Sequence, residues 1–207
     1  STNTSGIRLS EIASDFPPEL RARFLGVHFF NPPRHLHLAE LIPLAETRPE
    51  VIAGVSTFCD QRLGKGVVVC NDTPNFIANR VGVFSLLATI HHAQQFGLGF
   101  DVVDALTGPL IGRQKSATFR TADVVGLDTF AHVVKTMADT LPDDPWHHYY
   151  AIPEWLKKLI EQGALGQKTR RGVYQKVGRD IHVLDPASGS YRASGGEADA
   201  GVVEIMK

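Results

Sequence analysis

Residues 23–44, RFLGVHFFNPPRHLHLAELIPL, predict two β-strands joined by a sharp turn. Aromatic and β-branched side chains favour a strand over residues 23–30. The Asn-Pro-Pro sequence that follows ends this strand, because proline donates no hydrogen bond to a neighbouring strand. Residues 36–44 are apolar with polar insertions and predict the second strand. A hairpin-like return would bring His28 close to Glu40.

Strand and helix patterns continue downstream of this pair. The apolar stripe of residues 49–63 predicts a helix that starts at a proline and ends before Gly64. Residues 67–70 predict a short buried strand. Residues 1–71 therefore alternate strand and helix, which is typical of part of a parallel α/β sheet.

The pattern changes after Asn71. A long stretch without proline, 75–96, predicts one helix. Further helical segments are expected over 101–106, 121–141, with an interruption near Gly126, and 153–163. A small hairpin is expected over 172–174 with 181–184. The chain is thus expected to comprise an α/β segment over 1–71, a helical segment over 72–192 and a linker-like tail over 193–207, rich in alanine, glycine and serine.

Composition excludes several classes of protein. The net charge of −1 comes from 21 basic and 22 acidic residues, so no basic excess indicates a nucleic-acid partner or an anionic membrane. No run of apolar residues is long enough for a transmembrane helix, and the polar N-terminus has no signal-peptide core. Two cysteines, Cys59 and Cys70, cannot build a disulfide framework, so a reducing cytoplasmic compartment is expected.

His28 and Glu40 are the strongest candidates for chemistry. A histidine beside a carboxylate suits general acid–base catalysis, because the carboxylate sets the tautomer and stabilises the imidazolium. From spacing alone, however, this signal is weak, and a buried histidine paired for packing is the favoured interpretation. His35 and His37 lie nearby, but no cysteine or acidic pair completes a ligand set, so we expect no metal site.

Four short sequences, in the same order, resemble the L-3-hydroxyacyl-CoA dehydrogenase family of fatty-acid β-oxidation, in its bacterial form. They are NTSGI (3–7), GVHFFNPP (26–33) followed by Glu40, NDTPNFIANR (71–80) and ADVVGLDT (122–129). The resemblance runs over about residues 1–175, most of the chain.

The resemblance implies a fold. It implies an α/β remnant, the end of a Rossmann-type NAD-binding domain, over residues 1–71. An all-α domain of the 6-phosphogluconate dehydrogenase C-terminal-like type, which binds substrate and forms dimers, follows over 72–192. No GxGxxG sequence follows a predicted strand, so the chain looks like a fragment without the phosphate-binding loop. We therefore expect this chain alone to be inactive.

The resemblance also implies roles for individual residues. His28 matches the catalytic base that takes the proton of the 3-hydroxyl, and Glu40 matches its partner. Asn79 and Ser5 match residues that contact the substrate oxygen. These types suit alcohol oxidation, which needs a base, neutral donors at the developing carbonyl and a hydride acceptor.

Cofactor-side residues are implied as well. Asn3, Ser5 and Asn31 match residues on the NAD side of the site. One position departs from the family, since Asn75 stands where the family sequence has glycine. Asparagine tolerates the left-handed conformation better than most residues, so the turn is expected to survive.

The resulting hypothesis is NAD-dependent oxidation of an L-3-hydroxyacyl-CoA to a 3-oxoacyl-CoA by a homodimer. A fused enoyl-CoA hydratase domain is compatible with the tail. A hydroxyacid dehydrogenase with a lysine base is disfavoured, because residues 75–96 contain no lysine. A non-catalytic CoA-ester-binding or dimerisation module remains the alternative.

Overall fold

The computed structural model describes residues 1–205, which form two compact units. The first unit is Ser1–Val81 and the second begins at Gly82. This division comes later than the predicted change near residue 72. The reason is that the start of the long helix α4 (Ala78–Gln95) is hydrogen-bonded to Glu40 of the first unit.

The first unit contains a three-stranded sheet of order β1 (Leu25–Phe29), β2 (Leu38–Pro43) and β3 (Gly66–Val69). β1 and β2 are antiparallel, whereas β2 and β3 are parallel. The alternation of strand and helix indicated part of a parallel sheet, which holds for β2 and β3, whereas the predicted hairpin-like return makes β1 antiparallel. Its connection to β2 is a short turn, while a parallel pair needs a crossover, which the helix α3 (Pro49–Gln61) supplies for β3.

The N-terminal segment extends this sheet beyond β1. Thr2 forms a parallel bridge with Gly26, and the Val27 N–H donates to the Thr2 carbonyl at 2.9 Å. Two short helices, α1 (Leu9–Ile12) and α2 (Pro18–Arg21), follow before β1. The segment and β1 thus run side by side in the same direction.

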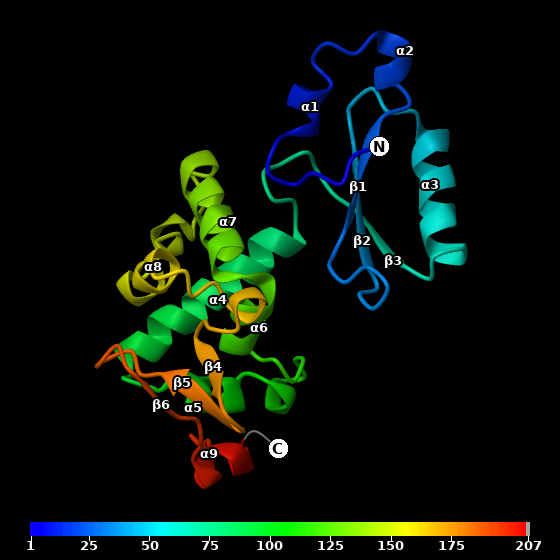
Figure 1. Cartoon of the computed structure of the whole chain (residues 1–207). Helices are drawn as coiled ribbons and strands as arrows, with labels where there is room; N and C mark the ends of the chain where they lie inside the picture. Colours follow the sequence, from blue (N-terminus) through cyan, green and yellow to red (C-terminus); the bar gives the residue numbers. More distant parts are fainter. Residues whose placement is uncertain (206–207) are drawn as a thin grey trace. The chain divides into compact units, whose positions relative to one another are not determined.

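The two faces of the sheet are packed by different helices (Figure 1). Alternate residues of β1 and β2, together with Cys59 of α3, form one apolar cluster. Leu9 of α1 joins Ile42, Cys70 and Phe76 in a second cluster. Both cysteines are free, buried thiols.

The second unit is mainly helical, as expected. Its helices are the main part of α4, then α5 (Phe100–Leu106), α6 (Phe119–Val125), α7 (Leu127–Thr140), α8 (Glu154–Glu161) and α9 (Ala200–Ile205), with 3₁₀ turns at Pro109–Ile111, His147–Tyr149 and Gln167–Thr169. The largest fully buried side chains of its core include Phe100, Phe119, Phe130, Leu127, Met137 and Leu156. No helix within residues 1–205 combines the length and apolarity needed to cross a membrane.

A small antiparallel sheet completes the second unit. It has the order β4 (Tyr174–Val177), β5 (Asp180–Leu184) and β6 (Tyr191–Ala193). The β4–β5 hairpin was predicted, but the third strand was not. Apart from this small sheet, the regular structure of the second unit is helical, as the predicted all-α domain implies.

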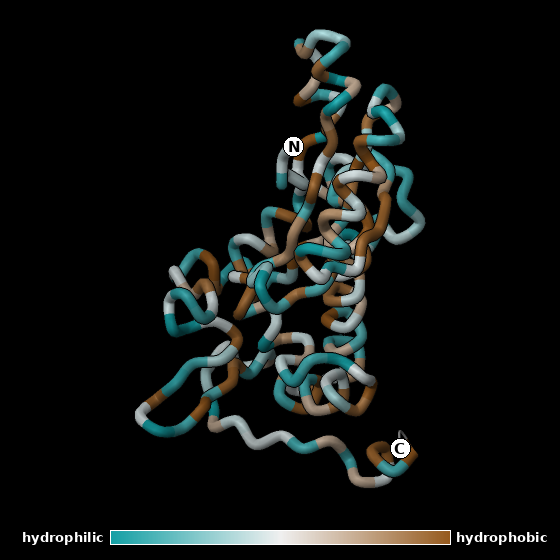
Figure 2. The backbone as a smooth tube through the Cα atoms, turned by 90° about the vertical axis from the view of Figure 1, so that its right-hand side faces the viewer, coloured by the Kyte–Doolittle hydropathy of each residue, from teal (hydrophilic) through white to brown (hydrophobic). Residues whose placement is uncertain are grey.

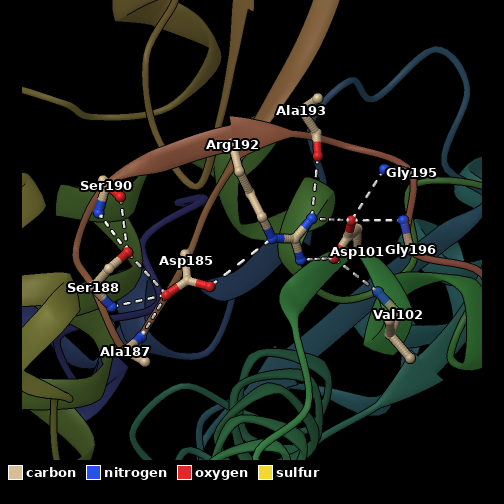
Figure 3. Close-up of polar contacts among 10 residues, drawn as sticks. All are labelled: Asp101, Val102, Asp185, Ala187, Ser188, Ser190, Arg192, Ala193, Gly195 and Gly196. Atoms are coloured by element: carbon tan, nitrogen blue, oxygen red, sulfur yellow. Dashed lines mark hydrogen bonds and ion pairs between the residues drawn. The ribbon is translucent and has the colours of Figure 1, made fainter.

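Residues 191–196, here called the strap, are docked, although the tail from residue 193 was expected to be a linker. Arg192 donates to both carboxylate oxygens of Asp101 at 2.7 and 2.9 Å, and the Gly195 and Gly196 N–H groups donate to the same carboxylate (Figure 3). Beyond the strap a short stretch, residues 197–199, leads to α9 (Figure 2).

Neutralising Asp101 is expected to release the strap. Burial raises the pKa of Asp101, but hydrogen bonds from Arg192, Gly196 and Gly195 outweigh burial and hold it well below the usual range. A lowered pKa means that this contribution to stability is present at neutral pH and is lost as the pH falls through the folded-state pKa. In Asp101→Asn, amide hydrogen exchange across residues 190–200 should accelerate at neutral pH by about tenfold or more.

The exposed carboxylate of Glu197 lies just beyond the strap and provides the matched control. Glu197→Gln should leave exchange unchanged. Equal exchange in Asp101→Asn and the parent protein would show that the ion pair does not hold the strap.

Candidate active site

His28 and Glu40 face each other directly across β1 and β2. His28 Nδ1 lies 2.8 Å from Glu40 Oε2, and the two residues are only 7% and 1% exposed. Directly opposed residues of an antiparallel pair share one face of the sheet. The hairpin predicted from the sequence is therefore confirmed, and it brings the two candidate residues together.

The second oxygen of Glu40 binds the start of α4. The N–H groups of Ile77 and Ala78 donate to Oε1 at 3.1 and 2.7 Å. A carboxylate is stabilised at this end of a helix, where unpaired N–H groups and the helix dipole meet. The sequence does not predict these two donors, because main-chain N–H groups are not tied to a particular type of side chain.

The charge on Glu40 determines the tautomer of His28. Burial raises the pKa of Glu40, but the hydrogen bonds from His28, Ala78 and Ile77 outweigh burial and hold it below its usual value. With Glu40 ionised, Nδ1 of a neutral His28 carries the proton, so Nε2 is left as a proton acceptor. This arrangement can perform general acid–base catalysis.

Cys70 is a further neighbour of Glu40. Burial and the Glu40 carboxylate raise the pKa of the Cys70 thiol to about 11, so the thiol stays protonated at neutral pH. The sequence identified Cys70 only as a small buried group. Its place beside the carboxylate depends on the end of β3, which no local pattern reveals.

Ser5 and Asn79 form a second polar pair in the first unit. Asn79 Nδ2 donates to Ser5 Oγ at 3.3 Å, and both residues are half-buried. Asn79 follows Ala78 in the first turn of α4, so it lies next in the chain to a donor of Glu40. Residues 77–79 therefore connect the four residues proposed as catalytic. Ile77 and Ala78 bind Glu40, which pairs with His28, and Asn79 binds Ser5.

The other two candidates are placed differently. Asn3 Oδ1 accepts a hydrogen bond from the Phe29 N–H at 2.7 Å, so its carbonyl group is used in fastening the N-terminal segment to β1. Asn31 is exposed in the turn after β1, and its side chain forms no hydrogen bond with any residue from 1 to 205. The structure does not bring Asn31 into contact with the other candidates.

Asn3, Ser5 and Asn31 remain candidates to hold the cofactor that the family resemblance implies. The N-terminal segment and β1 are parallel, so Asn3, Ser5 and Asn31 follow the carboxyl ends of neighbouring strands. Ligands of α/β sheets bind outside these ends. Neutral amide and hydroxyl groups there suit an uncharged carboxamide and ribose hydroxyls. Within residues 1–205 no group of three or more His, Cys, Asp and Glu side chains could hold a metal.

Comparison with known families identifies both units. Residues 1–73 match the model of the 3-hydroxyacyl-CoA dehydrogenase NAD binding domain, and residues 76–176 match the C-terminal domain of the same enzymes. An NAD-binding α/β unit followed by a helical unit defines a class of NAD-dependent dehydrogenases. The chain belongs to the 3-hydroxyacyl-CoA dehydrogenase family. The predicted family, the fold class and NAD as the cofactor are thereby confirmed.

Individual relatives agree with this assignment. A Bacillus subtilis (strain 168) protein named "Probable 3-hydroxyacyl-CoA dehydrogenase" is 48% identical over 191 residues, which is 92% of this chain and 24% of that protein. The fatty acid oxidation complex subunit alpha of Acinetobacter baumannii (strain AYE) is 32% identical over 90% of this chain and 25% of its own length. The chain thus spans about a quarter of the length of these two relatives.

A solved structure shows the same fold. The crystal structure of Mycobacterium tuberculosis FadB2 has a TM-score of 0.71 and 32% sequence identity. The alignment covers 84% of this chain and 59% of FadB2.

Proposed function

We propose that this protein oxidises the 3-hydroxyl group of an L-3-hydroxyacyl-CoA to a 3-oxo group, as a step of fatty-acid β-oxidation. The observation that carries the proposal is the buried His28–Glu40 pair with its 2.8 Å contact. The family assignment supplies the substrate class.

Each residue has a defined task in this reaction. His28 Nε2 takes the proton of the 3-hydroxyl, and Glu40 stabilises the imidazolium that forms. Ser5 Oγ and Asn79 Nδ2 hydrogen-bond the substrate oxygen as it becomes a carbonyl. Asn3, Ser5 and Asn31 would hold NAD, which would supply the acceptor for the hydride that leaves C3.

Glu40→Gln tests the pairing in the natural full-length protein. The glutamine oxygen can still accept the Ile77 and Ala78 N–H groups, so the start of α4 is kept. Its amide nitrogen, however, would face Nδ1 of His28. Because an amide N–H is itself a donor, it would disfavour a proton on Nδ1. We expect kcat for acetoacetyl-CoA reduction by NADH to fall about 10²-fold or more, with an unchanged circular dichroism spectrum.

Two other outcomes would change this interpretation. Unchanged kcat in a folded Glu40→Gln variant would show that the pair serves packing alone. Loss of the folded state would make Glu40 a structural residue.

The 207 residues by themselves are proposed to be inactive, because they contain no glycine-rich phosphate loop. The same property supports the alternative, a module that binds CoA esters or forms dimers without catalysis. Binding of acetoacetyl-CoA by the full-length protein without any oxidation of NADH would favour the module.

A homodimer is proposed as the assembly. The second unit has an open apolar groove of about 330 Å³, lined by residues that include Phe84, Ala88, Phe96 and Leu106, and Phe96 is 70% exposed. Apolar surface of this kind is covered when a symmetric dimer forms. The molar mass in solution, measured by light scattering, checks this proposal, and a monomeric mass would contradict it.

The fatty acid oxidation complex subunit among the relatives favours a longer, multifunctional protein, in which a hydratase domain accompanies the dehydrogenase. The cytoplasmic location expected from Cys59 and Cys70 stays a prediction.

A further inference from the structure

We propose that Asn75 and Phe76 are positioning residues for the His28–Glu40 pair. Their backbone makes a left-handed turn that aims two N–H groups at Glu40 and places the Phe76 ring against His28. This inference rests on the proposed function for its kinetic consequences, but its structural core can be tested without them.

The turn has an uncommon backbone. Asn75 has φ 62° and Phe76 has φ 49°, so two consecutive residues with side chains are left-handed. Asparagine adopts this conformation more readily than most residues, whereas a bulky residue is strained in it. Such a conformation persists only where the surroundings enforce it.

The surroundings enforce it through main-chain contacts and burial. The Asn75 N–H donates to the Ser5 carbonyl, and the Phe76 N–H donates to the Thr73 carbonyl, both at 3.0 Å. Asn75 and Phe76 are 1% and 2% exposed. The turn is therefore fastened to the segment that carries Ser5.

The consequence for the pair is direct. The next two residues along the chain, Ile77 and Ala78, donate to Glu40 Oε1, so the turn sets the direction of both N–H groups. The Phe76 ring meets the His28 ring edge-on, with centroids 5.5 Å apart, and Phe30 contacts the same imidazole at 4.5 Å. The turn thus holds Glu40 through Oε1, the carboxylate oxygen that does not contact His28. The Phe76 ring limits rotation of the imidazole.

The side chain of Asn75 supports a backbone role. Its Nδ2 is buried and has no hydrogen-bond partner within residues 1–205. A buried amide nitrogen without a partner is destabilising, so a hydrogen bond from Nδ2 does not explain why asparagine stands at position 75. Asparagine stands at position 75 because it adopts a positive φ readily. Glycine adopts the same conformation, so Asn75→Gly should preserve the turn.

Substitutions at position 75 distinguish a role of the Asn75 backbone conformation from a role of its side-chain amide. Asn75→Gly permits the turn, Asn75→Ala strains it mildly, and Asn75→Val strains it most, because a β-branched residue is a poor left-handed residue. Asn71→Val, at an exposed position of the same connection, is the matched control.

The first measurement is steady-state reduction of acetoacetyl-CoA by the full-length protein. We expect Asn75→Gly and Asn71→Val to stay within about twofold of the parent, and Asn75→Val to lose about tenfold or more in kcat, with little change in KM. Asn75→Ala should fall between, and it serves in place of Asn75→Val if that variant does not fold. A large loss in Asn75→Gly would overturn the inference and assign the amide to ligand binding.

The second measurement needs no activity. Nitrogen-15 NMR of the histidine rings in the 207-residue chain reports the tautomer of His28. We expect the Nδ1-protonated form in the parent and in Asn75→Gly, and a mixture of tautomers in Asn75→Val. One tautomer throughout would overturn the inference even if the parent is active. An inactive parent with the expected spectra would contradict the proposed function alone.

Discussion

His28→Ala is expected to lower kcat for the reduction of acetoacetyl-CoA by NADH about 10²- to 10⁴-fold. In this direction the imidazole donates the proton that it accepts during alcohol oxidation. The Nδ1 side of His28 is occupied by Glu40, so only Nε2 is available for the substrate. Steady-state kinetics of the full-length protein, with thermal unfolding to confirm folding, provide the measurement.

His35→Ala is the control for this variant. His35 is an exposed histidine in the turn between β1 and β2, so its loss should leave kcat within about twofold. Near-normal turnover in a folded His28→Ala variant would remove the basis for the proposed mechanism.

Asp104→Ala is expected to lower the free energy of unfolding by more than about 3 kcal/mol. The buried Asp104 carboxylate accepts four hydrogen bonds that join α5 to the start of α6 and to β4. The donors are the N–H groups of Thr118, Phe119 and Arg120 and the hydroxyl of Tyr174. Alanine would leave these donors without their acceptor in the core, which costs more than the loss of a surface contact.

Asp128→Ala is the matched control in the same unit. Asp128 pairs with Lys168 at 2.6 Å, but both side chains are more than a third exposed, so its loss should cost less than about 1 kcal/mol. Denaturant unfolding of both variants measures the difference. Equal stabilities would show that the Asp104 network does not hold the second unit together.

The strongest predictions from the sequence came from local patterns. The two strands around Asn-Pro-Pro, the helices and the β4–β5 hairpin depend on residues close in the chain, and all of these elements are present. The meeting of His28 and Glu40 followed from the hairpin. The family resemblance implied only that Ser5 and Asn79 both contact the substrate oxygen. Their mutual hydrogen bond was not predicted, because no pattern connects residues so far apart.

The features that sequence reasoning missed depend on distant contacts. The strap is docked on Asp101 through an ion pair between widely separated parts of the chain. The second bond of Glu40 engages main-chain groups of Ile77 and Ala78, and side-chain identity does not reveal such partners.

The left-handed turn at Asn75 and Phe76 was predicted in part. The asparagine at position 75 was expected to tolerate a positive φ, and its φ of 62° agrees with that expectation. The same conformation at Phe76 could not be foreseen, because it follows from packing against His28 and the neighbouring cluster.

The most direct test of the central claim is the oxidation of NADH by the natural full-length protein in the presence of acetoacetyl-CoA. We expect sustained turnover that yields L-3-hydroxybutyryl-CoA in equal amount to the NADH consumed. Tight binding of acetoacetyl-CoA with no consumption of NADH would contradict it and would assign the protein to CoA-ester binding without catalysis.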